Sequence, residues 1–176
     1  MNDWEEFLAR QPGDDAPGPD AARPIVDVAS ERIWNAYRRV YKRGRNVVPE
    51  TSAETLHELR IDCKMLRYLL EFFRSLYPPR AVAKLVDALR QLQDNLGDFN
   101  DLEVQQASLR SFAQGMSDEG LASVESLLAI GCLVEHLSRR QIGERQRFAK
   151  CWSSFATRET RQRFRSLFKN RASAAR

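Results

Sequence analysis

Apolar residues recur every three or four positions along most of this chain, which is the spacing of an amphipathic helix. One such run, within residues 51–77, comprises Leu56, Leu59, Cys63, Leu66, Leu70 and Phe73. A second run, within residues 79–113, comprises Val82, Leu85, Leu89, Leu92, Leu96 and Phe99. β-branched residues are sparse, and no segment shows the alternation typical of a strand. The pattern therefore predicts an all-α fold.

Proline and glycine residues divide the helical part into four long segments. They span residues 24–43, 51–77, 79–113 and about 120–169. Gly44 is a natural C-terminal stop for the first segment. The third segment is open to a bend at Gly97, and the fourth to an interruption at Gly131 or Gly143. Long amphipathic segments joined by short loops predict an antiparallel bundle of four helices.

The first residues of the chain differ in composition from the rest. Residues 11–24 contain four of the seven prolines, which excludes a continuous helix there. We therefore predict an acidic N-terminal piece and linker over residues 1–23 and a helical domain over residues 24–176. No apolar run reaches the roughly 20 residues that span a bilayer, and the N-terminus lacks a hydrophobic signal core. We expect a cytoplasmic protein without membrane contact.

Few residues suit metal or disulfide chemistry. Cys63, Cys132 and Cys151 are widely spaced and match no metal-ligand pattern. His57 and His136 are the two histidines of the chain, too few for a histidine-rich metal site. We expect reduced thiols, no metal site and no cofactor.

The charge of the chain is distributed unevenly. The net charge is +4, but residues 1–22 hold six acids and one Arg. Residues 139–176 hold twelve Arg or Lys and two Glu. Such asymmetry favours an anionic partner. The alternative is an ordinary solvated helix surface, which is the default use of Arg and Lys.

The second segment, LHELRIDCKMLRYLLEFF, carries a basic stripe. The stripe consists of His57, Arg60, Lys64 and Arg67. Steps of three, four and three place these side chains along one face of the helix, separate from its leucines. Neighbouring like charges repel each other by a few tenths of a kcal/mol per pair. An acidic partner in the fold or an anionic ligand must offset this repulsion.

The third segment offers an acidic face as one such partner. Its aspartates are Asp87, Asp94, Asp98 and Asp101. Carboxylates at this spacing can orient facing arginine side chains through bidentate hydrogen bonds. A structural salt-bridge layer between the two helices is the simpler interpretation, although burying so many charges costs more than their pairing returns. We favour an open groove, where an arginine meets an acid on one side and an anion on the other.

These two segments together resemble the CHAD domain, the conserved-histidine α-helical domain. The first family motif, H-x-x-R-x-x-x-K/R-x-x-R-Y-x-x-E, is matched by His57, Arg60, Lys64, Arg67, Tyr68 and Glu71. The second, Q-x-x-L-G-x-x-x-D, is matched by Gln93, Leu96, Gly97 and Asp101, with Asp98 and Asn100 close by. The resemblance extends over about residues 24–170.

The resemblance implies a helical bundle whose basic surface binds inorganic polyphosphate without catalysis. The residues expected to bind polyphosphate are His57, Arg60, Lys64, Arg67, Tyr68, Arg39, Lys42 and Arg140. The acids expected to support them are Glu71, Asp94, Asp98 and Asp101. The resemblance also implies a functional link to tunnel-type triphosphate hydrolases and a location at polyphosphate granules.

The family domain usually contains two related four-helix halves, each with its own histidine motif. This chain shows one motif, and its segments resemble the second half. Three arrangements stay open: the first half is missing, another chain supplies it, or two copies of this chain form a homodimer.

Two other functions compete with polyphosphate binding. A nucleic-acid-binding helical module would also use a basic surface, but the chain lacks interleaved exposed aromatic residues and an evident helix-turn-helix. A phosphatase or phosphotransferase would use His57 as its nucleophile. No carboxylate-histidine metal cluster and no phosphate-cradling glycine loop supports that chemistry.

Overall fold

Every regular element in the computed structural model, which describes residues 20–169, is a helix. The α-helices are α2 (Ile25–Gly44), α3 (Ala53–Phe72), α4 (Pro79–Asp118), α5 (Val124–Phe155) and α6 (Arg158–Phe164). Two short turns, the 3-10 helix η1 (Arg74–Leu76) and the π-helix η2 (Arg165–Lys169), complete the described chain. The all-α prediction is confirmed. The acidic piece and linker predicted for residues 1–23 lie almost wholly outside the described residues.

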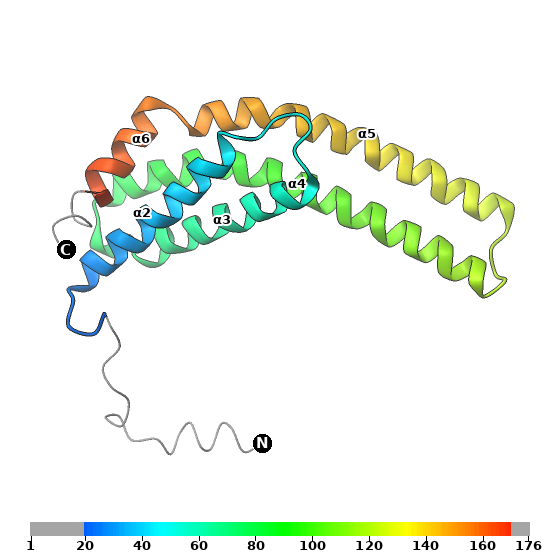
Figure 1. Cartoon of the computed structure of the whole chain (residues 1–176), viewed down its shortest axis with the longest axis horizontal. Coiled ribbons are helices and arrows are strands. Elements are labelled where there is room, and N and C mark those ends of the chain that lie inside the picture. Colours follow the sequence, from blue (N-terminus) through cyan, green and yellow to red (C-terminus); the bar gives the residue numbers. More distant parts are fainter. Residues whose placement is uncertain (1–19, 170–176) are drawn as a thin grey trace, which may run out of the picture.

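The helices do not form a simple four-helix bundle. α3 packs against both α2 and α4, α4 packs against α5, and α2 packs against η2. These contacts gather α2, α3 and α6 around one end of the long α4–α5 pair (Figure 1). The other ends of α4 and α5 project from this body as a hairpin. We call residues 107–140 of this hairpin the arm. The predicted antiparallel bundle of four helices is therefore not confirmed, whereas its helical character is.

Helix ends follow side-chain caps more than glycines. Ser52, Ser123 and Thr157 cap α3, α5 and α6, each accepting a hydrogen bond from the backbone N–H three residues later, which satisfies one of the free donors at a helix start. The predicted interruption of the last segment at a glycine is wrong, because the chain breaks at the Thr157 cap instead. α4 likewise passes through Gly97 without ending and continues to Asp118.

The core consists of the apolar seams that the sequence pattern predicted. Every member of the two predicted seams is buried except Phe73, which is half-buried and packs against the core. Burying one such side chain contributes roughly 1.5–3 kcal/mol. The remaining helix faces carry polar side chains together with some exposed apolar ones. None of the described helices is long and apolar enough to cross a membrane.

An aromatic cluster ties the C-terminal helices to α2. Phe155, Phe164 and Phe168 are fully buried. The ring of Tyr37 stacks on that of Phe164, with 4.0 Å between centroids, and Tyr77 meets Phe168 edge-on at 4.9 Å. Such pairs contribute about 0.5–1.5 kcal/mol beyond the area they bury. This cluster fixes α6 and η2 beside α2.

The cysteines are unpaired thiols, as expected. Cys63 is buried in the core, Cys151 is half-buried and Cys132 is exposed on the arm. Burial raises the pKa of the Cys63 thiol well above its usual value, so this side chain stays protonated and packs as a small apolar group.

Gly44 is the last residue of α2. The need for a glycine there comes from packing and not from a left-handed backbone. The residue is buried, and a Cβ atom added to it would overlap the ring of Trp152 on α5. We expect Gly44→Ala to lower the free energy of unfolding by about 1–3 kcal/mol, because overpacking forces the ring to move. Gly143→Ala is the matched control: its Cβ meets nothing within 4 Å, so it should raise that free energy by up to about 1 kcal/mol. Urea denaturation measures both, and equal stability of Gly44→Ala and the wild type would contradict the packing.

Candidate functional site

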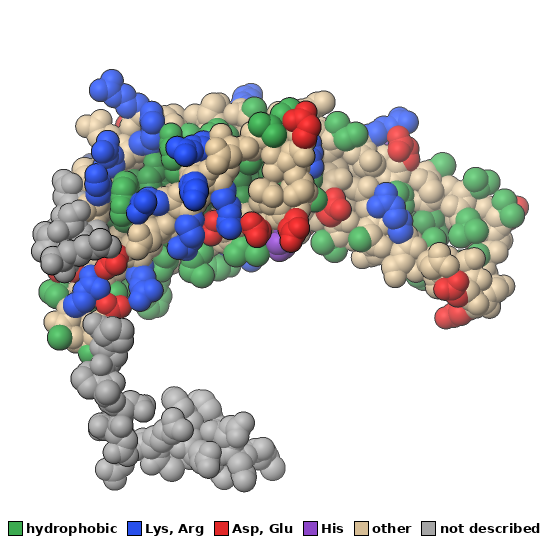
Figure 2. Space-filling view, in the orientation of Figure 1, with side chains coloured by type: hydrophobic (Ala, Val, Ile, Leu, Met, Phe, Trp, Pro, Cys, Tyr) green, Lys and Arg blue, Asp and Glu red, His purple; other side chains and the backbone are tan. Residues whose placement is uncertain are grey.

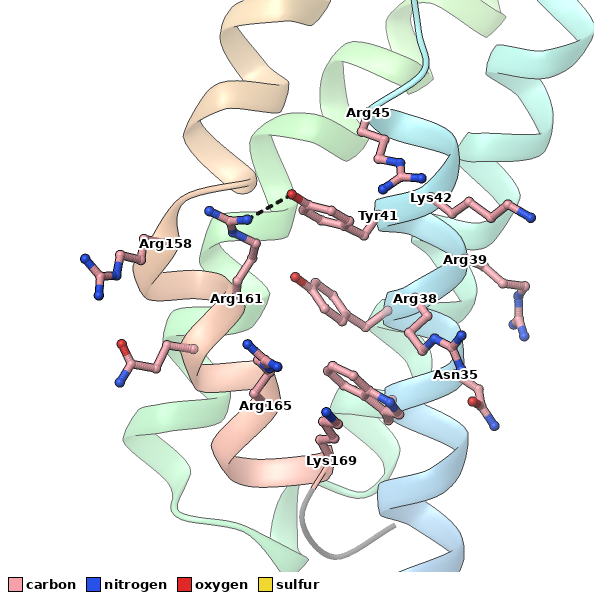
Figure 3. Close-up of a pocket in the computed structure, with 13 residues that line it drawn as sticks. Asn35, Arg38, Arg39, Tyr41, Lys42, Arg45, Arg158, Arg161, Arg165 and Lys169 are labelled. Carbon is pink, nitrogen blue, oxygen red and sulfur yellow. Dashed lines mark hydrogen bonds between the residues drawn. The ribbon is translucent and has the colours of Figure 1, made fainter. Parts of the chain in front are cut away.

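The most strongly basic feature of the described chain is an open hollow between α2 and the segment formed by α6 and η2 (Figure 3). Its volume is about 1120 Å³. Eight of the residues that line it are cations: Arg38, Arg39, Lys42, Arg45, Arg158, Arg161, Arg165 and Lys169. Among the described lining residues there is no Asp or Glu. We call this feature the basic hollow. Figure 2 shows Lys and Arg side chains gathered over α2 and α6 on the same face.

The spacing of these cations along their helices brings them together. Arg38, Lys42 and Arg45 follow steps of four and three along the end of α2. On the opposite wall, formed by α6 and η2, the cations follow steps of three, four and four: Arg158, Arg161, Arg165 and Lys169. Steps of this size keep side chains on one face of a helix. In Figure 3, Arg161, Arg165 and Lys169 lie in the space between the two segments, whereas Arg158 on one side and Arg39 and Lys42 on the other project outward from it.

Most of the cations in the basic hollow have no acidic partner. Arg39 forms an ion pair with Asp62, its Nε lying 3.2 Å from Oδ1. Among the described residues, no ion pair is formed by Arg38, Lys42, Arg45, Arg158 or Arg165, and each of these residues is exposed. Their charge is therefore available to an anion that enters the hollow.

Aromatic side chains form the floor of the basic hollow. Trp34, Tyr37 and Tyr41 line it from α2. Arg161 lies over the ring of Tyr41 at 5.8 Å and donates a hydrogen bond of 3.2 Å to the Tyr41 hydroxyl. This contact orients the guanidinium group at low entropic cost. Burial raises the pKa of the Tyr37 phenol, and the charge of Tyr41 would raise it further, so Tyr37 stays protonated.

Asp62 links the wall of the basic hollow to α3. Its side chain is 10% exposed and accepts hydrogen bonds from Arg39 at 3.2 Å and from Arg43 at 2.6 Å. Arg43 also pairs with Glu58 at 3.2 Å. The pairing fixes two neighbouring arginines of α2 in place. Sequence reasoning missed Asp62 because this residue lies within the apolar seam of α3.

The predicted basic stripe lies elsewhere, on the side of α3 that faces α4. None of its residues lines the basic hollow. His57 Nδ1 lies 2.5 Å from Asn100 Oδ1 on α4. A carbonyl oxygen only accepts hydrogen bonds, so this pairing requires the tautomer of His57 in which Nδ1 is the donor. This bond joins the two sequence motifs directly.

Arg67 is the most constrained residue of the basic stripe. Its Nε is buried without a hydrogen-bond partner within the described chain, and the same holds for Oε1 of Gln93. The guanidinium lies 5.6 Å from the centre of the Tyr68 ring, and Nε is 3.9 Å from Glu71 Oε1. Tyr68 and Glu71 thus both lie beside Arg67, as the motif suggested. Arg60 and Lys64 are half-buried along the same edge.

The acids predicted on α4 do not hold the basic stripe. Asp94, Asp98 and Asp101 are all exposed, and within residues 20–169 none of them forms an ion pair. Their spacing does place them on one face, but that face points to solvent, away from the buried seam of α4. The α4 residue that forms a hydrogen bond to the basic stripe is an amide, Asn100, which pairs with His57. The prediction of these three supporting acids is therefore wrong in its geometry.

Of the three other predicted residues, two lie in the basic hollow and one lies outside both surfaces. Arg39 and Lys42 line the basic hollow. Arg140 lies near the middle of α5, is exposed, and does not line the hollow. Sequence reasoning left five lining arginines without a specific role. They are Arg38, Arg45, Arg158, Arg161 and Arg165. Their helical spacing was visible in the sequence, but the packing of α6 on α2 was not.

The family model for the CHAD domain matches residues 1–110. The match covers more than half of the 176 residues, so the chain belongs to the CHAD domain family. It includes α2, α3, both sequence motifs and the first part of α4. It does not support the assignment of the chain to the second half of the family domain. No curated protein was found to match the chain.

Removing the charge of Asp62 should weaken the fold. We expect Asp62→Asn to lower the free energy of unfolding by about 1–3 kcal/mol, because hydrogen bonds from Arg39 and Arg43 to a charged group would be lost. The exposed Asp94 supplies the control, since Asp94→Asn should change that free energy by less than about 0.5 kcal/mol. Urea denaturation compares the two. Equal destabilisation would instead restore a supporting role for Asp94.

Proposed function

We propose that this chain binds inorganic polyphosphate, or a similar phosphate-rich polyanion, through the basic hollow and without catalysis. The observation that carries the proposal is the set of eight cations that line one open hollow, with no acid among its described lining residues. Membership of the CHAD family supports the same class of ligand.

The chemistry of the basic hollow suits a repeated phosphate better than a single small anion. Polyphosphate presents a charge on every unit and no other recognition group, so it requires several cations along a path. The walls on α2 and on α6 with η2 provide such a path, and arginine forks bind phosphate oxygens in pairs. Counterions released from the polymer add to the affinity and make it fall with salt.

The residues of the basic hollow support binding over turnover. Besides its cations, the hollow is lined by Trp34, Asn35, Tyr37, Tyr41 and Gln162. Neither a carboxylate nor an imidazole is among these described residues, so the lining offers no ordinary general base. Separately, no group of three or more His, Cys, Asp or Glu side chains within residues 20–169 could hold a metal ion.

We further propose that the basic stripe is a second contact region for the same polymer. The supporting observations are the half-buried Arg60, Lys64 and Arg67 along the α4 edge of α3 and the single 3.9 Å ion pair that Arg67 forms with Glu71. A long polymer can engage both regions. A cytoplasmic location at polyphosphate granules and a link to triphosphate hydrolases remain predictions from the family.

Charge removal in the basic hollow tests the main proposal. Arg38→Ala combined with Arg165→Ala should weaken polyphosphate binding at least about tenfold and lower the salt slope by about two, because each lost contact reduces that slope by about one. Arg90→Ala with Arg110→Ala removes the same charge from exposed positions of α4 and should leave affinity within about twofold. Fluorescence anisotropy with labelled polyphosphate at several salt concentrations measures both. Equal losses would show that only net charge matters.

Two further results would overturn parts of the proposal. If duplex RNA displaces polyphosphate at equal phosphate concentration, the chain is a general polyanion or nucleic-acid binder. If the protein releases orthophosphate from polyphosphate in the presence of a divalent metal, and His57→Ala abolishes this release, binding without catalysis is wrong.

A separate variant tests the basic stripe. We expect Arg60→Ala with Arg67→Ala to weaken binding of long polyphosphate several-fold while keeping the helical circular-dichroism signal, because both side chains lie at the surface edge of α3. Binding of a chain too short to reach both regions should be unchanged. Full retention of affinity for every length would show that the stripe is structural.

A further inference from the structure

The arm exposes apolar side chains that nothing in the described chain covers. No residue of α4 after Gln106 and no residue of α5 before Phe148 is buried. Val124 is 69% exposed, Leu128 66% and Ile142 54%. The view in Figure 2 shows hydrophobic side chains along the arm. A two-helix hairpin lacks the third and fourth helices that cover α4 and α5 within the body.

One face of α5 has a spacing that reads the same in both directions. Its members are Val124, Leu128, Gly131, Glu135, Ser138 and Ile142. The steps are four, three, four, three and four, so all six share one helical face. The set is symmetric about position 133. An antiparallel partner with the same sequence would place Val124 opposite Ile142, Leu128 opposite Ser138 and Gly131 opposite Glu135. This is the self-complementarity that a twofold interface requires.

We propose that two copies of this chain dimerise through this face of α5, with the two α5 helices antiparallel. Val124, at one apolar end of the face, then lies opposite Ile142 of the second copy. Leu128 lies one turn further along the same contact. The two hairpins together supply the four helices of a bundle. The second copy is the occupant that the distribution of charge along the two hairpin helices favours.

Gly131 lies beside the centre of the proposed contact. A Cβ atom added to it would meet nothing within 4 Å, so packing within the chain does not require a glycine here. Glycine inside a helix costs about 1 kcal/mol relative to alanine. A small residue at a crossing point allows two helices to approach closely, which gives this glycine a role in the dimer.

Charge along the arm favours the same antiparallel arrangement. Residues 111–138 contain no Lys or Arg, and their acids are Asp118, Glu119, Glu125 and Glu135. Residues 139–150 contain five Arg or Lys and one Glu. In an antiparallel dimer the acidic tip of one hairpin therefore lies beside the basic base of the other. Glu135 on the contact face is already paired with Arg139 at 2.7 Å, so its charge is compensated.

Two exposed leucines of α5 allow a matched test. Leu128 lies on the proposed face, whereas Leu133, which is 53% exposed, lies off it. We expect sedimentation equilibrium to show a dimer of the full chain. Leu128→Glu should raise the dimer dissociation constant at least about tenfold, equivalent to 1.4 kcal/mol, and Leu133→Glu should change it less than about threefold. Circular dichroism confirms that both variants fold.

A distance measurement tests the register independently. Cys132 is exposed and adjacent to the centre of symmetry, so a spin label can be attached to it in the Cys151→Ser variant. Packed helix axes lie about 8–10 Å apart. We therefore expect a label-to-label distance on the order of 20 Å between copies. A monomer at all concentrations, equal effects of the two leucine variants, or a much longer distance would each overturn the proposal. None of these outcomes depends on polyphosphate binding.

Discussion

The basic hollow depends on one apolar contact, the packing of α6 and η2 on α2 through Tyr37, Phe155, Phe164 and Phe168. Its two walls carry charge of one sign and repel each other. Exposed like charges cost a few tenths of a kcal/mol per pair. Each buried aromatic ring contributes roughly 1.5–3 kcal/mol, and Tyr37 stacks on Phe164 at 4.0 Å. The apolar term is larger, so the walls stay together without a ligand.

Holding the cations in place before binding has a consequence for affinity. A flexible basic tail must order its side chains when an anion arrives, at a cost of about 0.5–1.5 kcal/mol for each side chain. In this fold the helix backbones, the Tyr41–Arg161 contact and the Asp62–Arg39 pair already restrict several of them. The end of α2 also carries a partial negative charge that favours nearby cations. Capping of this helix and the proposed anion binding would therefore use the same arginines.

The periodic pattern was enough to predict the helices and the buried seams, because both are set locally by steps of three and four residues. It was not enough for the site. The aspartates of α4 share a face, as predicted, but their spacing cannot show whether that face meets α3 or solvent. The helix break at Thr157 depends on a side-chain cap, whereas the pattern drew attention to Gly131 and Gly143, through which α5 continues. The pairing of α2 with α6 joins residues more than one hundred positions apart, and no local pattern encodes it.

The family match covers one part of the molecule and leaves another part outside it. It ends at residue 110, just after Gln106, the last buried position of α4. Both sequence motifs and the α2 wall of the basic hollow lie inside the match, whereas α6 and η2 lie outside it. The basic hollow is thus composite. Its α2 wall belongs to the matched region, and its opposite wall is contributed by this chain's C-terminal helices. Because a path for a polyanion needs both walls, family membership alone cannot set the affinity of this chain.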